Sequence, residues 1–312
     1  MSTQPNIAFF GTPDRAVIAL EALKRAGLKP SLIVTQPDRP QGRKLLLTPP
    51  PAKVWAEAQG IPVLQPIDPS EPSFMDSLKS RGFDLFVVVA YGKIMKKALL
   101  SIPKYGAINL HASLLPRLRG SSPIETALLQ DERETGVTVI LMDELMDHGP
   151  ILMQERVAVP VWPLPADDLA RILVDKGGEL LALCIRGLIS ESLKPVEQDH
   201  SKATVTKKIS KEDGLMDLAA DPYKNFLKWN AYKGWPGSYF FTERDGKYGK
   251  KMRVNITDAA LENGAFVIKR VVPEGRKEMG WATFCPSSTA EAPYNKSGRQ
   301  GMLDDRAARE IY

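Results

Sequence analysis

The stretch Asp84–Tyr91 (DLFVVVAY) constrains the fold more than any other part of the sequence, because it is apolar at almost every position. A strand with apolar side chains on both faces is buried on both faces, which is typical of a parallel sheet covered by helices on each side. Parallel neighbours also need long crossover connections, which are usually helices. The run therefore predicts an α/β fold built around a parallel sheet.

The sequence around this run alternates between strand and helix patterns. Further strands are predicted at Asn6–Phe10, Leu32–Thr35, Ala107–Leu110, Val137–Met142 and Ile151–Val159. Helices are predicted at Pro51–Gln59, Ser70–Arg81, Pro123–Leu129 and Ala166–Leu188. The alternation indicates a doubly wound, mostly parallel sheet. Ligands of such sheets bind beyond the C-terminal ends of the strands, so the loops after Phe10, Tyr91 and Leu110 are expected to share one site.

The last third of the chain has a different pattern. Short alternating strands are predicted at Tyr239–Glu243, Met252–Thr257 and Ala265–Val272, after a helix at Asp221–Trp229. One helix followed by several short strands fits a small β-barrel of the OB-like kind. We therefore predict an α/β domain at 1–190, a polar linker at 191–208, a β-barrel-like domain at 209–284 and a disordered tail at 285–312.

The charge of the chain is divided unevenly between these parts. Residues 1–200 hold 22 Lys and Arg against 23 Asp and Glu, a net charge of −1, whereas residues 201–312 hold 20 against 14, a net charge of +6. A basic excess confined to the last third indicates a polyanionic partner for that part. A basic but merely solvated surface is the alternative that composition leaves open.

Several classes of protein are not supported by the sequence. Cys184 and Cys285 lack the spacing of zinc ligands, so we expect two reduced thiols and no metal site. No apolar stretch approaches the roughly 20 residues that span a bilayer, and the N-terminus lacks the pattern of a secretory signal. We expect a cytoplasmic protein with no membrane partner. A monomer is expected because no self-complementary apolar surface stands out.

Polar side chains follow the predicted strand Ala107–Leu110. Asn109 and His111 stand at alternate positions, so both point to the same side of the strand. A carboxamide and an imidazole at a strand end suit the stabilisation of a developing oxyanion. Asp147 lies in a predicted turn between two strands, where its carboxylate could orient His111 or take a proton from an attacking nucleophile. An Asn, a His and an Asp alone do not name a reaction.

The neighbouring residues make this pattern specific. Asn109–Arg117 (NLHASLLPR), Thr135–Thr138 (TGVT) and Met146–Pro150 (MDHGP) resemble, in sequence and spacing, the signature of the folate-dependent formyltransferases. Phe10–Asp14 (FGTPD) and Thr35–Arg43 (TQPDRPQGR) are similar to the members of that family that act on a tRNA. The resemblance is strongest in the first half and weaker in the last third, at Ile209–Asp213, Trp235–Gly237 and Pro273–Lys277.

The resemblance implies a Rossmann-like formyltransferase domain, an OB-like C-terminal domain and a reaction. The formyl group of 10-formyltetrahydrofolate would pass to the free α-amino group of methionine on initiator methionyl-tRNA, for translation initiation. By this resemblance Asn109 and His111 would hold the tetrahedral oxyanion, and Asp147 would position His111 and assist proton transfer. Either His111 or Asp147 could take the proton. The substrate amine is the nucleophile, so no covalent enzyme intermediate is expected.

The resemblance also assigns binding residues. The folate would lie against Val88, Ala90, Tyr91, Gly92, Ser113, Leu114, Leu115, Pro116 and Arg117. The methionyl group and the tRNA would lie against Phe10, Gly11, Thr12, Pro13, Arg39, Arg43 and Lys44. Structural roles are the alternatives: Val88 as a buried strand residue, the glycine turn as a plain connection, and the Gln36–Pro51 loop as a solvated loop. A sixteen-residue loop without its own structure is more often functional.

Two departures and two alternative functions accompany this reading. Arg15 stands where relatives commonly carry an apolar residue, and Leu45–Leu47 stand where relatives have more basic residues and glycine. A formyltransferase with a small-molecule amine acceptor would need neither the long loop nor a basic C-terminal domain. A catalytically inactive tRNA-binding homologue would not need Asn109, His111 and Asp147.

Overall fold

The structure is a computed structural model that describes residues 4–42, 45–242 and 251–285. The chain divides into two compact units, Met1–Lys208 and Ile209–Tyr312. The division falls at the end of the predicted linker. The predicted tail lies outside the described residues except for Cys285.

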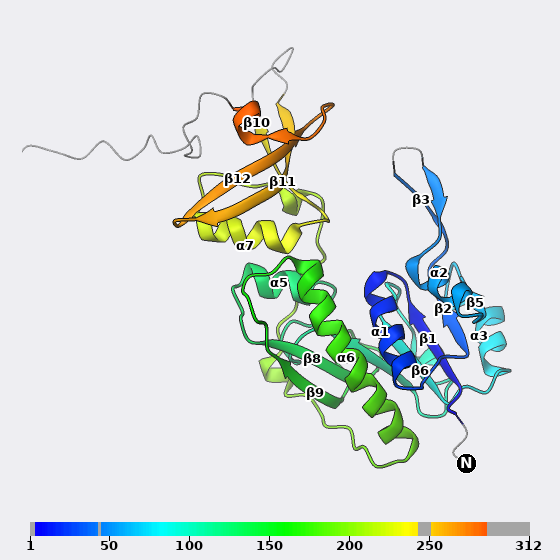
Figure 1. Ribbon diagram of the computed structural model, residues 1–312. Coiled ribbons are helices and arrows are strands. Elements are labelled where there is room, and N and C mark those ends of the chain that lie inside the picture. Colours follow the sequence, from blue (N-terminus) through cyan, green and yellow to red (C-terminus); the bar gives the residue numbers. More distant parts are fainter. Residues whose placement is uncertain (1–3, 43–44, 243–250, 286–312) are drawn as a thin grey trace, which may run out of the picture. The chain divides into compact units, whose positions relative to one another are not determined.

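The first unit is built on a seven-stranded sheet with the order β5-β2-β1-β6-β7-β8-β9 (Figure 1). The five strands from β5 to β7 are parallel, and β8 and β9 complete the sheet as antiparallel strands. Their bounds are β1 Ile7–Gly11, β2 Leu32–Val34, β5 Val63–Leu64, β6 Leu85–Val89, β7 Ala107–His111, β8 Thr135–Leu141 and β9 Ile151–Val157. The predicted doubly wound, mostly parallel sheet is confirmed, and the apolar run around β6 lies at its centre.

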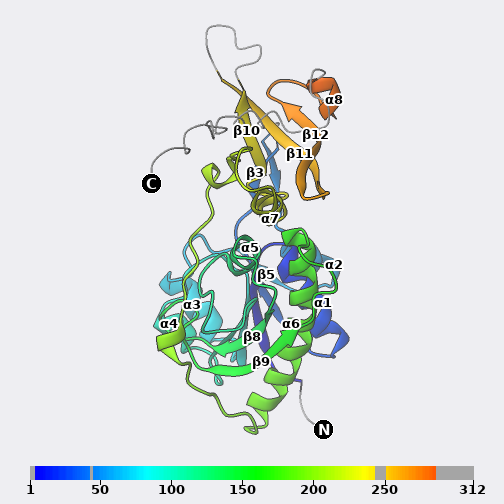
Figure 2. The ribbon, with the colours of Figure 1, turned by 90° about the vertical axis from the view of Figure 1, so that its left-hand side faces the viewer.

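Helices cover both faces of this sheet (Figure 2). α3 (Pro72–Lys79) and α4 (Lys97–Leu100) pack on the face that carries Phe10, Phe86 and Val88. The opposite face is covered by α1 (Asp14–Arg25), α2 (Pro51–Ala58) and the long α6 (Ala166–Ile189), while α5 (Pro123–Leu129) follows β7. Every residue of β6 is buried, as the sequence predicted for a strand between two helical layers.

Two glycines let α6 approach the sheet closely. A Cβ at Gly177 would lie 2.5 Å from a methyl carbon of Leu110, and one at Gly178 would lie 2.3 Å from Cβ of Ala22 on α1. Larger residues at these positions would push α6 away from both layers. Because Leu110 stands between Asn109 and His111, this packing also fixes the strand that carries the two polar side chains.

The predicted loop Gln36–Pro51 contains structure that the sequence reading missed. β3 (Arg39–Gln41) and β4 (Leu46–Thr48) pair antiparallel as a hairpin, so this prediction of an unstructured loop is wrong. At the base of the hairpin Lys53 Nζ donates to Asp38 Oδ2 at 2.8 Å, and Gln65 Nε2 donates to Asp38 Oδ1 at 2.7 Å. These two donors lower the pKa of the Asp38 carboxyl, Gln65 more than Lys53. The hairpin is therefore anchored at a defined point.

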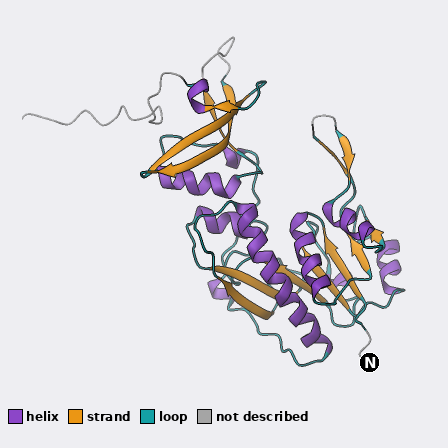
Figure 3. Cartoon of the chain, in the orientation of Figure 1, coloured by secondary structure: helices purple, strands orange, loops and turns teal. Residues whose placement is uncertain are grey.

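The second unit contains a four-stranded antiparallel sheet with the order β10-β11-β12-β13 (Figure 3). Its elements are η2 Glu212–Gly214, α7 Pro222–Tyr232, β10 Ser238–Thr242, β11 Met252–Glu262, β12 Ala265–Pro273, β13 Met279–Gly280 and α8 Trp281–Phe284. Trp229 of α7 packs with Phe240, Val254 and other apolar side chains of the sheet to form a separate core. These antiparallel strands fit the predicted small barrel-like domain.

Candidate active site

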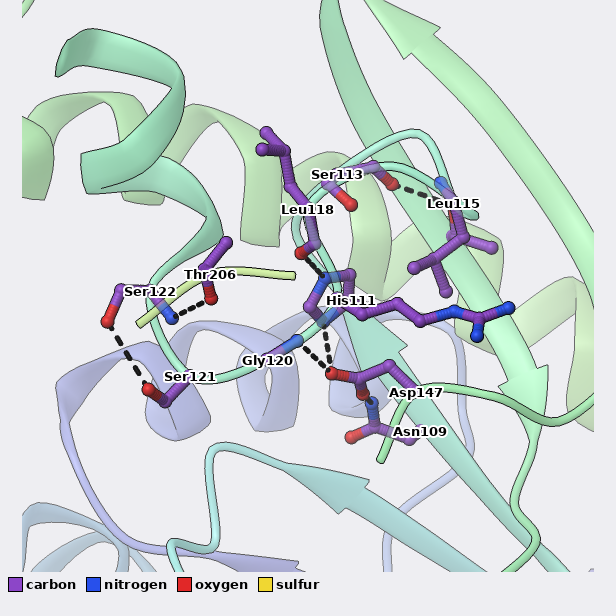
Figure 4. Close-up of polar contacts among 12 residues, drawn as sticks. Asn109, His111, Ser113, Leu115, Leu118, Gly120, Ser121, Ser122, Asp147 and Thr206 are labelled. Carbon is purple, nitrogen blue, oxygen red and sulfur yellow. Dashed lines mark hydrogen bonds and ion pairs between the residues drawn. The ribbon is translucent and has the colours of Figure 1, made fainter. Parts of the chain in front are cut away.

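Asn109 and His111 lie at the C-terminal end of β7, in the middle of the sheet. β7 pairs with β6 on one side and β8 on the other, and Asn109 is opposite Val88 in the register with β6. The alternation of side chains along the strand places both polar residues on one face, while Leu110 points to α6 on the other. Figure 4 shows Asn109, His111 and Asp147 facing one another.

Asp147 reaches this pair from the turn between β8 and β9. It has a left-handed backbone with φ of 50°, which is uncommon for a residue with a side chain. Its Oδ2 atom accepts a hydrogen bond from the backbone N–H of Gly120 at 2.8 Å and lies 3.5 Å from Nδ1 of His111. Its Oδ1 atom lies 3.4 Å from Nδ2 of Asn109. The structure therefore brings together three residues that are 38 positions apart at most.

His111 is buried and its ring is held from both sides. Nε2 lies 2.8 Å from the carbonyl oxygen of Leu118, which can only accept, so Nε2 carries the proton. Leu118 adopts a left-handed φ of 58° in this contact. With Nε2 assigned as the donor, Nδ1 faces the Asp147 carboxylate, either as a lone pair or as a second N–H.

This arrangement can handle both charge and protons. Nδ1 lies on the side of the His111 ring that faces Asp147, where an N–H can donate to a carboxylate or to an oxygen that becomes negative. Asn109 has N–H groups for the same purpose, and Asp147 can accept a proton. No side chain of the three is a strong nucleophile, so the cluster suits a reaction in which the substrate supplies the attacking atom.

The predicted folate residues near β6 differ in exposure. Ala90 and Gly92 are exposed, whereas Val88 and Tyr91 are buried. The Tyr91 ring packs edge-on against Phe10, and burial raises the pKa of its hydroxyl to about 12. The Tyr91 carbonyl accepts from Thr12 Oγ1 at 3.0 Å and from Gln36 Nε2 at 2.8 Å. Tyr91 thus ties three loops together through its backbone, while its side chain is part of the core.

The predicted folate residues after β7 are engaged mainly with their own loop and with β8 and β9. Ser113 Oγ donates to the carbonyl of Arg117 at 2.7 Å, and the carbonyl of Leu115, which precedes Pro116, accepts from Gln154 Nε2 at 2.8 Å. A cavity of about 260 Å³ is lined by Ser113, Leu114, Arg117, Leu118 and Glu132–Thr135. Its lining does not include Asn109, His111 or Asp147, but it includes Leu118, whose carbonyl contacts His111 Nε2.

The residues predicted for the methionyl group and the tRNA are also spread out. Phe10 is fully buried and Gly11 lies against Val89, where a Cβ would be 2.9 Å from the Val89 carbonyl. Thr12 and Pro13 form the turn into α1. Arg39 is exposed and its Nη2 donates to Gln36 Oε1, while Arg43 and Lys44 lie outside the described residues.

Arg15, which departs from the resemblance, forms ion pairs in this structure. Its guanidinium lies 3.1 Å from Glu125 Oε1 on α5 and 3.4 Å from Asp167 Oδ1 on α6. The first partner is nearly buried and the second is exposed. The charge of Arg15 is therefore used to join the first turns of three helices.

The sequence reading missed the contribution of the segment 191–208, which it treated as a polar linker. Thr204 Oγ1 accepts from the N–H of Leu118 at 2.8 Å, and Thr206 Oγ1 accepts from the N–H of Ser122 at 3.2 Å. Gln198 donates to the carbonyls of Asp147 and Gly149. This segment therefore supports the loop and the turn that hold His111 and Asp147. The sequence gives no signal for it, because threonine and glutamine are ordinary linker residues.

The described part of the chain also bears on metal sites and on membrane spans. Among residues 4–42, 45–242 and 251–285, no group of three or more His, Cys, Asp or Glu side chains is placed to hold a metal ion. Within the same ranges no helix is long and apolar enough to cross a bilayer.

Comparisons with known proteins show the family of the chain. The model of the formyl transferase family matches residues 5–184, which hold Asn109, His111 and Asp147. The chain belongs to the formyl transferase family. A curated relative, methionyl-tRNA formyltransferase of Chloroflexus aggregans, is 45% identical over 265 residues, covering 84% of each chain. The prediction of a formyltransferase from the Asn109–Arg117 signature is confirmed.

Solved structures share the fold at lower sequence identity. Methionyl-tRNA formyltransferase from Clostridium thermocellum superposes with a TM-score of 0.59 at 16% identity, covering 86% of this chain and 98% of that one. An N-formyltransferase from Helicobacter canadensis, in complex with folinic acid and dTDP-3-aminofucose, has a TM-score of 0.56 at 16% identity and covers 85% and 95%. These likenesses show a common fold.

Proposed function

We propose that this formyltransferase transfers the formyl group of 10-formyltetrahydrofolate to the α-amino group of methionine on initiator methionyl-tRNA, giving N-formylmethionyl-tRNA. The observation that carries the proposal is the cluster of Asn109, His111 and Asp147 at the end of β7, in a chain whose curated relatives are named for this activity.

In the proposed reaction the bound folate supplies the formyl carbon, and the substrate amine attacks it. Asn109 donates an N–H to the formyl oxygen as negative charge develops there. His111, fixed by the Leu118 carbonyl, directs Nδ1 toward the same region and toward Asp147. Asp147 accepts the proton that the amine loses, or stabilises His111 while His111 accepts it. The proton is then available to the folate nitrogen that leaves as the old C–N bond breaks.

The exposed loop after β6 supports a folate site beside this cluster. Ala90 and Gly92 follow β6 directly, they are exposed, and β6 is the neighbour of β7 in the sheet. Both have positive φ, 50° and 77°, which turns the backbone of this loop back over the strand end. Exposed main-chain groups at a strand end are suited to reading the edge of a pterin ring.

We assign tRNA binding to the exposed Arg39, to Arg43 and Lys44, and to the basic domain 209–284. Lysine and arginine contacts to phosphates give affinity that weakens with salt and does not depend on base sequence. We also propose domain bounds of 1–190 for catalysis and 191–208 for the linker. We further propose a monomer in the cytoplasm that requires no metal. These follow from the sequence and from the site of translation initiation.

The direct test is to incubate the purified chain with 10-formyltetrahydrofolate and methionyl-tRNA, comparing initiator and elongator forms. We expect formyl transfer to the initiator form and much less to the elongator form. An amino sugar nucleotide serves as a third acceptor. Transfer to that acceptor alone would replace the tRNA proposal with a small-molecule one, and absence of any transfer would remove the catalytic proposal.

The role of Asp147 is tested by Asp147→Asn. The amide still accepts from Gly120 N–H, but it loses the negative charge that faces His111. We expect kcat to fall by roughly 10²- to 10⁴-fold while KM for methionyl-tRNA stays nearly unchanged.

The matched control is Asp84→Asn. Asp84 accepts a hydrogen bond from the N–H of Asn6 at 2.8 Å, the same kind of contact as between Asp147 and Gly120. Asn6 and Asp84 stand at the N-terminal ends of β1 and β6, away from the catalytic end of the strands. The kcat of Asp84→Asn should equal that of the unchanged enzyme. Equal turnover in both variants would exclude Asp147 from the mechanism.

A further inference from the structure

The side chain of Gln198 makes four hydrogen bonds, which is the full capacity of a carboxamide. Its Nε2 donates to the carbonyl of Asp147 at 3.0 Å and to that of Gly149 at 2.7 Å. Its Oε1 accepts from Nε and Nη2 of Arg119 at 3.2 and 2.6 Å. Gln198 is also buried, so none of these partners is replaced by water without cost.

The two carbonyls that Gln198 holds belong to the turn that carries the Asp147 carboxylate. Asp147 has φ of 50° there, a conformation that costs free energy unless the surroundings enforce it. Gly149 lies so close to the end of β8 that a Cβ would be 1.9 Å from the Leu141 carbonyl. The turn is therefore held against the sheet at Gly149 and against Gln198 at both carbonyls.

Arg119 connects Gln198 to the loop that orients the catalytic groups. Leu118 accepts from Nε2 of His111 and Gly120 donates to Asp147, while Arg119 between them points the other way to Gln198. Arg119 is itself fixed, because its N–H donates to Thr204 O at 2.8 Å and its carbonyl accepts from Thr206 N–H at 2.7 Å. Its Nη2 also lies 2.8 Å from Nδ1 of His200, which must accept.

We propose that Gln198 is a positioning residue for formyl transfer, which fixes the backbone of Asp147 relative to His111 by bridging the turn to Arg119. This inference rests on the proposed catalytic role of Asp147. Gln198 is buried and all four of its hydrogen bonds go to protein groups, so its action on the reaction passes through Asp147. Its effect is on where the Asp147 carboxylate sits, and misplacement of a reacting group by about 1 Å can cost roughly 100-fold in rate.

A purely structural role for Gln198 predicts something different. It would lower stability when removed, but each folded molecule would turn over at the normal rate. The two roles are therefore separated by kcat of the folded enzyme, and by whether the effect depends on Asp147.

The primary variant is Gln198→Glu, which keeps the shape and the acceptor for Arg119. It replaces the two donors with an oxygen that faces two carbonyl oxygens, and the neighbouring guanidinium keeps the new carboxyl ionised. We expect kcat to fall roughly 10- to 100-fold with KM for both substrates unchanged.

Asn6→Asp is the matched control. The Asn6 carboxamide also donates to two main-chain carbonyls, Arg81 O at 2.9 Å and Gly82 O at 3.1 Å. Asn6 stands at the N-terminal end of β1, away from the catalytic end of the strands. Asn6→Asp should lower Tm without changing kcat. If Gln198→Glu does not fold, Arg119→Lys tests the same bridge, because lysine keeps the charge but cannot make the paired contact with Oε1.

Gln198→Glu and Arg119→Lys are then each combined with Asp147→Asn, which gives two double variants. If Gln198 acts through Asp147, its substitution has little further effect on kcat once the carboxylate is gone. An equal loss in both backgrounds, or a normal kcat for Gln198→Glu beside a strong effect of Asp147→Asn, would overturn the inference. A normal kcat for Asp147→Asn itself would overturn the catalytic assignment on which the inference depends.

Discussion

Replacing Gly120 with alanine tests a constrained backbone position of the site. Gly120 has φ of 110°, which residues with a side chain rarely adopt, and its N–H donates to Asp147 at 2.8 Å. An added Cβ would lie 2.6 Å from Thr206 Oγ1 and 3.0 Å from the Thr206 carbonyl oxygen. The Thr206 hydroxyl could rotate away, but the main chain of Thr206 is hydrogen-bonded to that of Arg119 and cannot move alone.

The expected cost combines two terms. Backbone strain at a positive φ is about 1–3 kcal/mol, and overpacking against fixed main chain adds about 1–3 kcal/mol. The total of about 2–6 kcal/mol lowers Tm by roughly 4–24 °C, at about 2–4 °C per kcal/mol for a domain of this size. Because the N–H donor to Asp147 shifts as the strain relaxes, kcat of the folded variant should also fall.

The assay is thermal unfolding together with kcat measured well below Tm, with Gly82→Ala as the matched control. Gly82 has φ of 60° and nothing within 4 Å of an added Cβ, so its substitution isolates the backbone term. Gly82→Ala should lower Tm by a few degrees and leave kcat unchanged. The reasoning is refuted if Gly120→Ala lowers Tm no more than Gly82→Ala, or if Thr206→Ala restores Gly120→Ala completely.

Two further predictions concern groups whose pKa is shifted. Burial raises the pKa of the Cys184 thiol to about 12. A disulfide reagent at pH 8 should therefore label Cys285 in the native protein and Cys184 only after denaturation. Rapid labelling of Cys184 in the native protein would contradict its burial. The pKa of Asp38 is lowered by Gln65 and Lys53, so its stabilising effect is complete above about pH 4 and is lost as pH falls through the lower folded value. Asp38→Asn should therefore lower Tm at neutral pH, and the difference should shrink below about pH 4; a constant difference would contradict this.

The central strands and the pair of Asn109 and His111 could be predicted because their signals are local. A continuous apolar run such as that of β6 predicts a buried parallel strand, and alternation on β7 places Asn109 and His111 on one face. The ranges given for β1, β2 and α5 match the structure to within a residue or so. The choice of reaction, by contrast, depended on resemblance, since the three residue types occur together in many sites.

Features set by contacts between distant segments could not be predicted. The β3–β4 hairpin has no strong turn signal, and its position depends on Asp38, Lys53 and Gln65, which meet only in the fold. Tyr91 shows the same limit. Its place in the sequence suggested a ligand contact, whereas the structure packs its ring against Phe10 in the core and uses its carbonyl as an acceptor for Gln36.

The loop 118–120 explains how the segment 191–208, which the sequence predicts to be a linker, can affect the reaction. Leu118 and Gly120 turn their main-chain groups toward His111 and Asp147, and a residue between two such neighbours must direct its side chain elsewhere. Arg119 therefore points away, where it needs partners because a buried guanidinium without acceptors is costly. Gln198 and His200 supply them, and the free end of the Gln198 carboxamide then faces the Asp147 turn. On this argument Gly120→Ala and Gln198→Glu disturb one carboxylate from two sides, so their effects on kcat should be less than multiplicative when they are combined.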